Sequence, residues 1–301
     1  MLTIVQAALE AGFLYAPIAL ALFLSFSILN IADMTTDGAF VLGSAVSAMM
    51  CLAGHPILAL PAGMAASAAA GFITAFLQTK LAVPSILAGI VTNIGLYSIN
   101  LMVMGKSNQS LFQTDTIYTM AKDAGFAGSW YELAVTAIIV LALCALLVLF
   151  LGTRLGLSIR ATGDNADMVR ASSVNPNFTI TVGLCVANAM TGLSGAMVAQ
   201  YSTFADVNSG TGMVVLALAA LVIGETLIGK GSMTRRVLGV VAGSIIYRFI
   251  YAAALRFNVP ADYMKLVSAV IVGVAIAAPA VRRWAAFQMQ KRRALAGRRG
   301  E

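Results

Sequence analysis

Long apolar stretches recur along the whole chain and set the first expectation of its architecture. Glycine, proline and charged residues divide them into about nine segments, or between eight and ten. Each segment is close to the roughly 20 residues that an α-helix needs to cross a bilayer. The pattern predicts an all-α polytopic membrane protein with a single transmembrane domain, residues 1–301. The expected spans are 12–30, 38–54, 57–77, 85–104, 132–151, 179–201, 213–228, 237–255 and 264–281.

Composition agrees with this interpretation. The chain is 60% hydrophobic and only 10% charged, whereas about a quarter of the residues in a soluble domain are charged. The net charge of +7 comes from Lys and Arg in a few short loops and in the basic tail, residues 282–301. Membrane orientation accounts for that distribution, so we expect lipid rather than nucleic acid as the partner of these charges.

The basic residues also predict which loops lie on the cytoplasmic side of the membrane. The loop 152–178, the turn 229–236 and the tail carry most of them, and all three fall on one side if the nine spans alternate. That side is therefore expected to be cytoplasmic, together with the C-terminus. The N-terminus is then external.

Two parts of the chain resemble each other weakly, about 1–105 and about 179–281. NIADMTTDGAF (30–40) and TFADVNSGTGM (203–213) are both Asp-containing breaks that precede a small-residue-rich segment. Five spans separate corresponding elements, so the second copy would be inverted in the membrane. Inverted repeats with interrupted helices are typical of transporters, where the breaks border the substrate pathway.

Polar residues within the apolar spans are the candidates for a translocation pathway, because such residues are costly in lipid and usually face the bundle interior. Arg248 could meet a substrate carboxylate or form a structural pair with Glu225 or Asp37, and we favour the structural pair. Asn93 and Tyr97 share one helical face. The candidates are Asn30, Asp33, Asp37, Asn93, Tyr97, Asn188, Asp206, Glu225 and Arg248.

The string GETLIGKGSMTRR (224–236) is close to the phosphate-binding loop G-x-x-x-x-G-K-[ST]. Gly231 stands where the magnesium-binding hydroxyl belongs, and the string follows an apolar span instead of a strand. We therefore expect a glycine turn between two membrane helices. Neither catalytic residues, a metal site nor a cofactor bound by this chain is predicted.

The cytoplasmic segment 155–180, LGLSIRATGDNADMVRASSVNPNFTI, is the most distinctive in the chain. It predicts a short amphipathic helix with Asp164 or Asn165 as its N-cap, ending before Pro176. An exposed helix of this kind needs a partner to offset its ordering entropy.

Within this segment, SIRATGDNADMVRASSVNPNFT resembles the cytoplasmic loop of ATP-binding-cassette importer permeases of the branched-chain amino acid and ribose family. Ser173 and Val174 depart from that family's Gly-Ile pair. NIADMTTDGAFVLGSA (30–45) is similar to its first broken helix, and the resemblance covers nearly the whole chain. By this resemblance, the coupling residues are Arg160, Ala161, Gly163, Asn165, Arg170 and Asn175.

The resemblance implies a permease subunit in the bacterial inner membrane, coupled to two ATPase subunits that bind ATP and magnesium. A second permease copy, with a homodimer favoured, and an external binding protein would complete the assembly. The implied cargo is an amino acid, aromatic or branched-chain. The alternatives are an ion-coupled secondary transporter that uses Asp33, Asp37 or Glu225, and an importer for a sugar or nucleoside.

Overall fold

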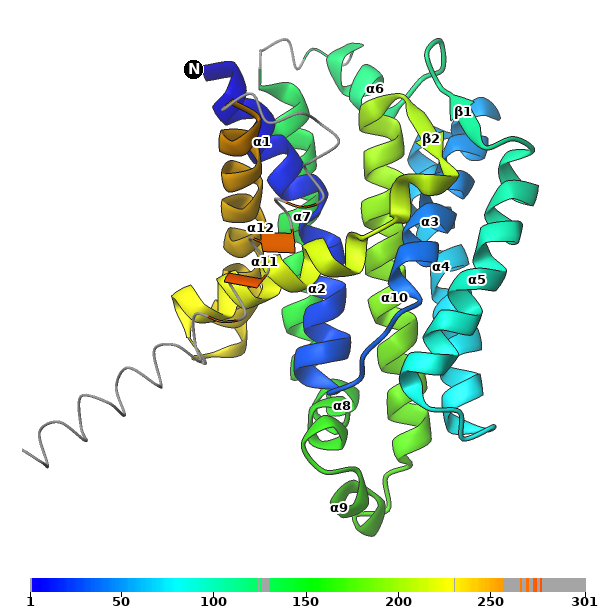
Figure 1. The fold of residues 1–301 in the computed structure, drawn as a ribbon, viewed down its shortest axis with the longest axis vertical. Coiled ribbons are helices and arrows are strands. Elements are labelled where there is room, and N and C mark those ends of the chain that lie inside the picture. The colour runs from blue at the N-terminus through cyan, green and yellow to red at the C-terminus, as the bar shows by residue number, and fades with distance from the viewer. Residues whose placement is uncertain are drawn as a thin grey trace, which may run out of the picture.

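The structure is a computed structural model that describes residues 2–123, 125, 130–229, 231–256 and the positions 266, 269, 270, 273, 274 and 277. These residues are almost entirely helical (Figure 1). The elements are α1 (Leu2–Leu14), α2 (Ala16–Leu22), the π-helix η1 (Phe23–Ile28), α3 (Thr36–Leu52), α4 (Pro56–Thr79), α5 (Ser85–Met104), β1 (Asn108–Ser110), α6 (Ile117–Asp123), α7 (Tyr131–Gly152), α8 (Arg154–Asp164), α9 (Ala166–Ala171), α10 (Pro176–Ser202), β2 (Phe204–Asp206), the 3-10 helix η2 (Val207–Gly210), α11 (Met213–Ile228) and α12 (Met233–Arg256).

Within the described ranges, seven helices are long and apolar enough to cross a membrane, and α3 is a shorter apolar helix. Together they correspond to eight of the nine predicted spans, which confirms the all-α polytopic architecture. The ninth predicted span, 264–281, lies outside the described residues apart from the isolated positions named above. The basic tail 282–301 lies outside them entirely.

The first predicted span is irregular in two places, although helical hydrogen bonds such as Tyr15 N to Ala11 O continue through it. α1 ends before Tyr15, Pro17 sits in the first turn of α2, and the hydrogen bonding then changes to the π register in η1. A proline lacks the N–H that would continue a helix, so it is tolerated at a helix start and favours a restart here.

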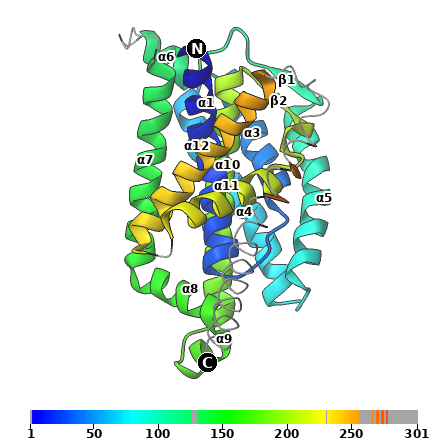
Figure 2. The same ribbon diagram turned by 60° about the vertical axis from the view of Figure 1, so that its left-hand side comes forward.

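The loops lie at two opposite ends of the bundle. α6 and a two-stranded antiparallel ribbon, in which β1 pairs with β2, lie at one end, and α8 and α9 lie at the other (Figure 1 and Figure 2). The predicted cytoplasmic segment 155–180 is thus on the far side of the membrane helices from the long loop that follows α5.

α10 runs through the centre of the bundle, packed against α3 and α4. Small residues make this packing close: a methyl group on Gly192 would come within 2.5 Å of Ser67 Cβ, and one on Gly63 within 3.0 Å of the Gly43 carbonyl oxygen. Lipid provides no hydrophobic drive for helix association, so close backbone approach supplies the packing energy instead.

α11 and α12 form a helical hairpin that is also closely packed at glycine residues. A methyl on Gly224 would lie 2.9 Å from Val240 Cα, and Gly229 ends α11 with a φ of +73°, in the left-handed region that glycine adopts readily. The phosphate-loop-like string is therefore the end of a membrane helix and a glycine turn, as predicted, although Lys230 lies outside the described residues.

Candidate functional site

The two predicted helix breaks are present, and Asp37 joins them. The first break separates η1 from α3, and the second separates α10 from α11. Asp37, in the first turn of α3, accepts hydrogen bonds from Val214 N at 2.9 Å and Gly212 N at 3.1 Å. These amides begin α11 and have no partner within the helix, so the carboxylate caps α11 and complements its dipole. The inverted relation of the two repeats stays a prediction.

A second carboxylate ties the first break to the central helix. Asp33 is only 3% exposed. Its Oδ2 accepts a hydrogen bond from Asn188 Nδ2 of α10 at 2.7 Å, and its Oδ1 accepts one from Thr35 N at 2.9 Å. Buried polar groups are retained when they are bonded in this way. Asp33 and Asn188 therefore fix the break against α10.

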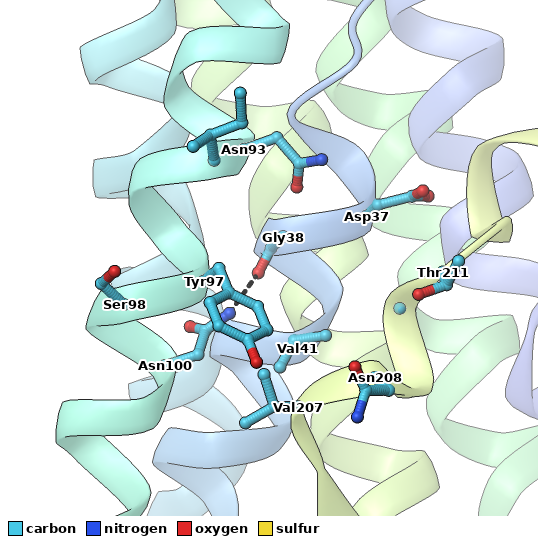
Figure 3. Close-up of a pocket in the computed structure, with 12 residues that line it drawn as sticks. Asp37, Gly38, Val41, Asn93, Tyr97, Ser98, Asn100, Val207, Asn208 and Thr211 are labelled. Carbon is cyan, nitrogen blue, oxygen red and sulfur yellow. Dashed lines mark hydrogen bonds between the residues drawn. The ribbon is translucent and has the colours of Figure 1, made fainter. Parts of the chain in front are cut away.

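A cavity of about 460 Å³ lies beside these breaks, between α3, α5 and η2 (Figure 3). Three predicted pathway residues line it: Asp37, Asn93 and Tyr97, a residue that is 51% exposed. On the η2 side, Asn208 and Thr211 face Tyr97 across the opening (Figure 3). The cavity combines amide, hydroxyl and carboxylate groups with apolar walls, which is the usual composition of a site for a small polar molecule.

Two predicted pathway residues have local structural roles and do not line the cavity. Asn30 adopts a φ of +57° where η1 ends, a conformation that Asn tolerates better than most residues. Asp206 accepts a hydrogen bond from Asn208 N at 2.8 Å and so begins η2. Both residues shape the breaks.

Glu225 is held in an ion pair at the α11–α12 hairpin, away from the cavity. Its Oε1 lies 2.9 Å from Arg236 Nη2 and accepts a hydrogen bond from Ser27 Oγ at 2.6 Å. Arg236 also donates to Ser27 Oγ at 2.8 Å and lies over the ring of Phe23, 4.9 Å from its centroid. This cluster attaches η1 to the hairpin.

The expected pairing of Arg248 with Glu225 or Asp37 is wrong. Arg236 occupies Glu225, and the α11 amides occupy Asp37. Arg248 instead stacks on Tyr15, with its guanidinium carbon 3.7 Å from the ring centroid. Partner choice depends on how helices rotate against each other, which polar positions in a sequence do not reveal.

The segment 155–180 contains two helices where one was predicted. The longer helix, α8, begins earlier, at Arg154, and the chain becomes extended at Asn165. The Asn165 side chain then caps α9 by accepting from Met168 N at 3.0 Å, so the predicted cap is confirmed. Asn175 caps α10 in the same way, through Asn177 N at 3.0 Å. Pro176 accordingly begins α10.

Gly163 of α8 touches the first helix break directly. A methyl group at this position would overlap the Ile28 carbonyl oxygen and lie 2.8 Å from the Ile28 carbonyl carbon. Arg160 and Ala161 precede it on α8 and are partly buried, whereas Arg170 on α9 is exposed and lies 3.4 Å from Asp167 Oδ1. α8 is therefore in contact with the end of η1, from which the break starts.

Ser27 and Arg236 contribute to this partly buried cluster, and neither is a predicted pathway residue. Arg236 follows Arg235, and this pattern predicts a basic surface turn. A usable signal was present, because Glu225 lies four residues before Gly229 and Arg236 four residues after Ser232. An antiparallel helical hairpin brings such positions to the same depth.

Comparison with known families matches residues 4–276 to the permease component of branched-chain amino acid transport systems. The tyrosine transport system permease protein of Clostridioides difficile (strain R20291) is 32% identical over 255 residues, or 84% of each chain. The ribose import permease protein RbsC of Escherichia coli (strain K12) is 26% identical over 251 residues, 81% of this chain and 75% of its own. No solved structure matches.

Apolar helices that are interrupted beside a polar cavity are typical of polytopic membrane transport proteins. The chain belongs to the family of permease components of branched-chain amino acid transport systems, which are permeases of ATP-binding-cassette importers. It is thus a membrane transport component of an importer.

Proposed function

We propose that this chain carries an amino acid, with aromatic amino acids favoured over branched-chain ones, through the inner membrane of a bacterium. The observation that carries the proposal is the cavity where the two breaks meet. Amide groups of Asn93 and Asn208 can donate to a substrate carboxylate, and Asp37 can accept from an ammonium group. Val41 and Val207 provide apolar wall for a side chain. The tyrosine permease relative supports the same cargo class.

Two ATPase subunits that bind ATP and magnesium would supply the energy, acting through α8 and α9 on the cytoplasmic side. A second copy of this chain and an external binding protein would complete the assembly, and the C-terminus would be cytoplasmic. In this proposal, ATPase closure displaces α8, the Gly163 contact moves the end of η1, and the break shifts with it. The cavity then opens to alternate sides, as in other alternating-access transporters.

The bonding of the three candidate carboxylates disfavours an ion-coupled secondary transporter. Asp33 is bonded to Asn188, Asp37 to two backbone amides, and Glu225 to Arg236. A carboxylate that carries a proton or sodium ion needs to exchange its partners during transport, and these three are engaged in holding helices together.

Uptake into proteoliposomes tests the proposal. The permease is reconstituted with its ATPase and external binding protein, and radiolabelled tyrosine, leucine and ribose are compared. We expect ATP-dependent uptake of tyrosine, no requirement for an ion gradient, and a loss of about tenfold or more in Tyr97→Ala. Leu101→Ala, on the same helix but outside the cavity lining, is the matched control. Uptake of ribose alone, or uptake driven by an ion gradient without ATP, contradicts the proposal.

A further inference from the structure

Arg248 has no carboxylate within ion-pair distance among the described residues. Neither of the two ion pairs among the described residues includes it, and its buried Nε atom has no hydrogen-bond partner there. Its printed contacts are with aromatic rings: Tyr15, at 3.7 Å from the centroid, and Tyr251, at 5.6 Å. A guanidinium in an apolar environment is costly unless an anion accompanies it.

A groove of about 600 Å³ opens in front of this guanidinium, between α1 and α12. Its walls are mostly small and apolar, with Ala8 and Ala11 on α1 and Ala252 and Leu255 on α12, and a second cation, Arg256, also lines it. The Leu255 side chain is 46% exposed, so the groove faces the surroundings of the bundle. It shares no lining residue with the cavity beside the breaks.

The groove lies toward the end of the bundle that the distribution of basic residues predicts to be external. α12 ends on the same side of the bundle as α6 and the β1–β2 ribbon (Figure 1 and Figure 2). Arg248 is eight residues before the end of α12 at Arg256, which corresponds to about 12 Å along a helix that rises 1.5 Å per residue. The long Arg side chain can direct its charge toward the interface from this depth.

We propose that the groove binds one anionic phospholipid of the outer leaflet, with its phosphate on Arg248 and an acyl chain along the alanine-lined wall. A guanidinium binds a phosphate through two parallel N–H···O bonds, the geometry that an amine does not provide. The groove has exposed lining and is separate from the cavity beside the breaks, which favours a lipid over the transported solute.

Occupancy of the groove would stabilise the joint between α1 and α2. Tyr15, which carries the Arg248 guanidinium on its ring, also stacks on Phe40 of α3 with a centroid distance of 6.1 Å and an interplanar angle of 13°. Phe40 is one helical turn from Asp37. The bound lipid would therefore influence the packing of α1, α12 and α3. A ligand that binds only the folded state raises the stability of that state.

Lipid retention and thermal stability test this proposal. The purified permease, as it assembles in the membrane, is placed in nanodiscs of phosphatidylcholine with and without phosphatidylglycerol, and retained lipid is counted by native mass spectrometry after detergent exchange. We expect phosphatidylglycerol to be retained and to raise the melting temperature. Arg248→Gln should weaken retention about tenfold or more, and Ala252→Leu should do so by filling the groove while leaving the charge in place.

The control is Arg235→Gln, which removes the same charge from the other end of α12 and should retain lipid as the wild type does. Inorganic phosphate added alone should not raise the melting temperature, because it lacks the acyl chain. Equal retention by Arg248→Gln and wild type overturns the proposal. Equal retention of phosphatidylcholine and phosphatidylglycerol, or displacement of the lipid by millimolar tyrosine, also overturns it.

Discussion

A single methyl group at Gly163 should separate ATP hydrolysis from transport. The added carbon of Gly163→Ala would lie 2.8 Å from the Ile28 carbonyl carbon and 2.9 Å from Leu29 Cα. Ordinary carbon–carbon contacts are about 3.5–4.0 Å, so α8 has to retreat by roughly 1 Å. Overpacking of this kind costs about 1–3 kcal/mol, and a coupling energy of that size corresponds to roughly 5- to 150-fold in the linked equilibrium.

The assay is uptake and ATP hydrolysis measured in the same proteoliposomes. We expect Gly163→Ala to hydrolyse ATP with much less uptake for each ATP consumed. Gly152→Ala is the matched control, because a methyl on this nearby glycine at the end of α7 meets nothing within 4 Å. Melting temperatures of both variants check that each is folded. Wild-type uptake per ATP in a folded Gly163→Ala protein would refute the role of this contact.

Three further substitutions test the local geometry. Ser173 has a φ of +61°, and this left-handed conformation costs a non-glycine residue about 1–2 kcal/mol. Ser173→Gly should therefore raise the free energy of unfolding by about 0.5–1 kcal/mol in a melting experiment. A lower melting temperature would contradict this. Asp37→Ala removes the cap of α11 and should cost about 1–2 kcal/mol, with Asp37→Asn milder; unchanged melting would show that the cap contributes nothing. Glu225→Gln and Arg236→Gln should be non-additive by about 1–3 kcal/mol in a double-mutant cycle, and additivity would show that the pair does not interact.

The membrane spans could be predicted because each one needs a long apolar run, and that requirement is visible in the sequence. The irregularity of the first span at Tyr15 and the π register of η1 could not be predicted from the sequence. The π-helix contains Ser27, whose partners Glu225 and Arg236 lie about 200 residues further along the chain. The predicted span six starts at 179, where the apolar run begins, whereas α10 starts three residues earlier, at Pro176.

The sequence indicates which residues belong to the candidate site better than it indicates which contacts they make. Asp37, Asn93 and Tyr97 stand out as polar groups in apolar runs, and all three line the cavity. Arg248 stands out for the same reason, yet it stacks on an aromatic ring. The resemblance identified Gly163 only as a motif position. Its contact with Ile28 joins residues far apart in the sequence, and nothing in the local pattern points to it.

Coupling through Gly163 requires that α8 and α9 face the cytoplasm and contact the ATPase. Met168 on α9 is 56% exposed. Of the native cysteines, Cys51 and Cys144 are buried and Cys185 is partly buried, so Met168→Cys combined with Cys185→Ser provides a reporter with low background. We predict that this cysteine reacts with a membrane-impermeant maleimide only in inside-out vesicles and forms a cross-link to the ATPase subunit in the assembled complex. Labelling from the external side, or a fully assembled complex without any cross-link from this segment to the ATPase, would contradict the account.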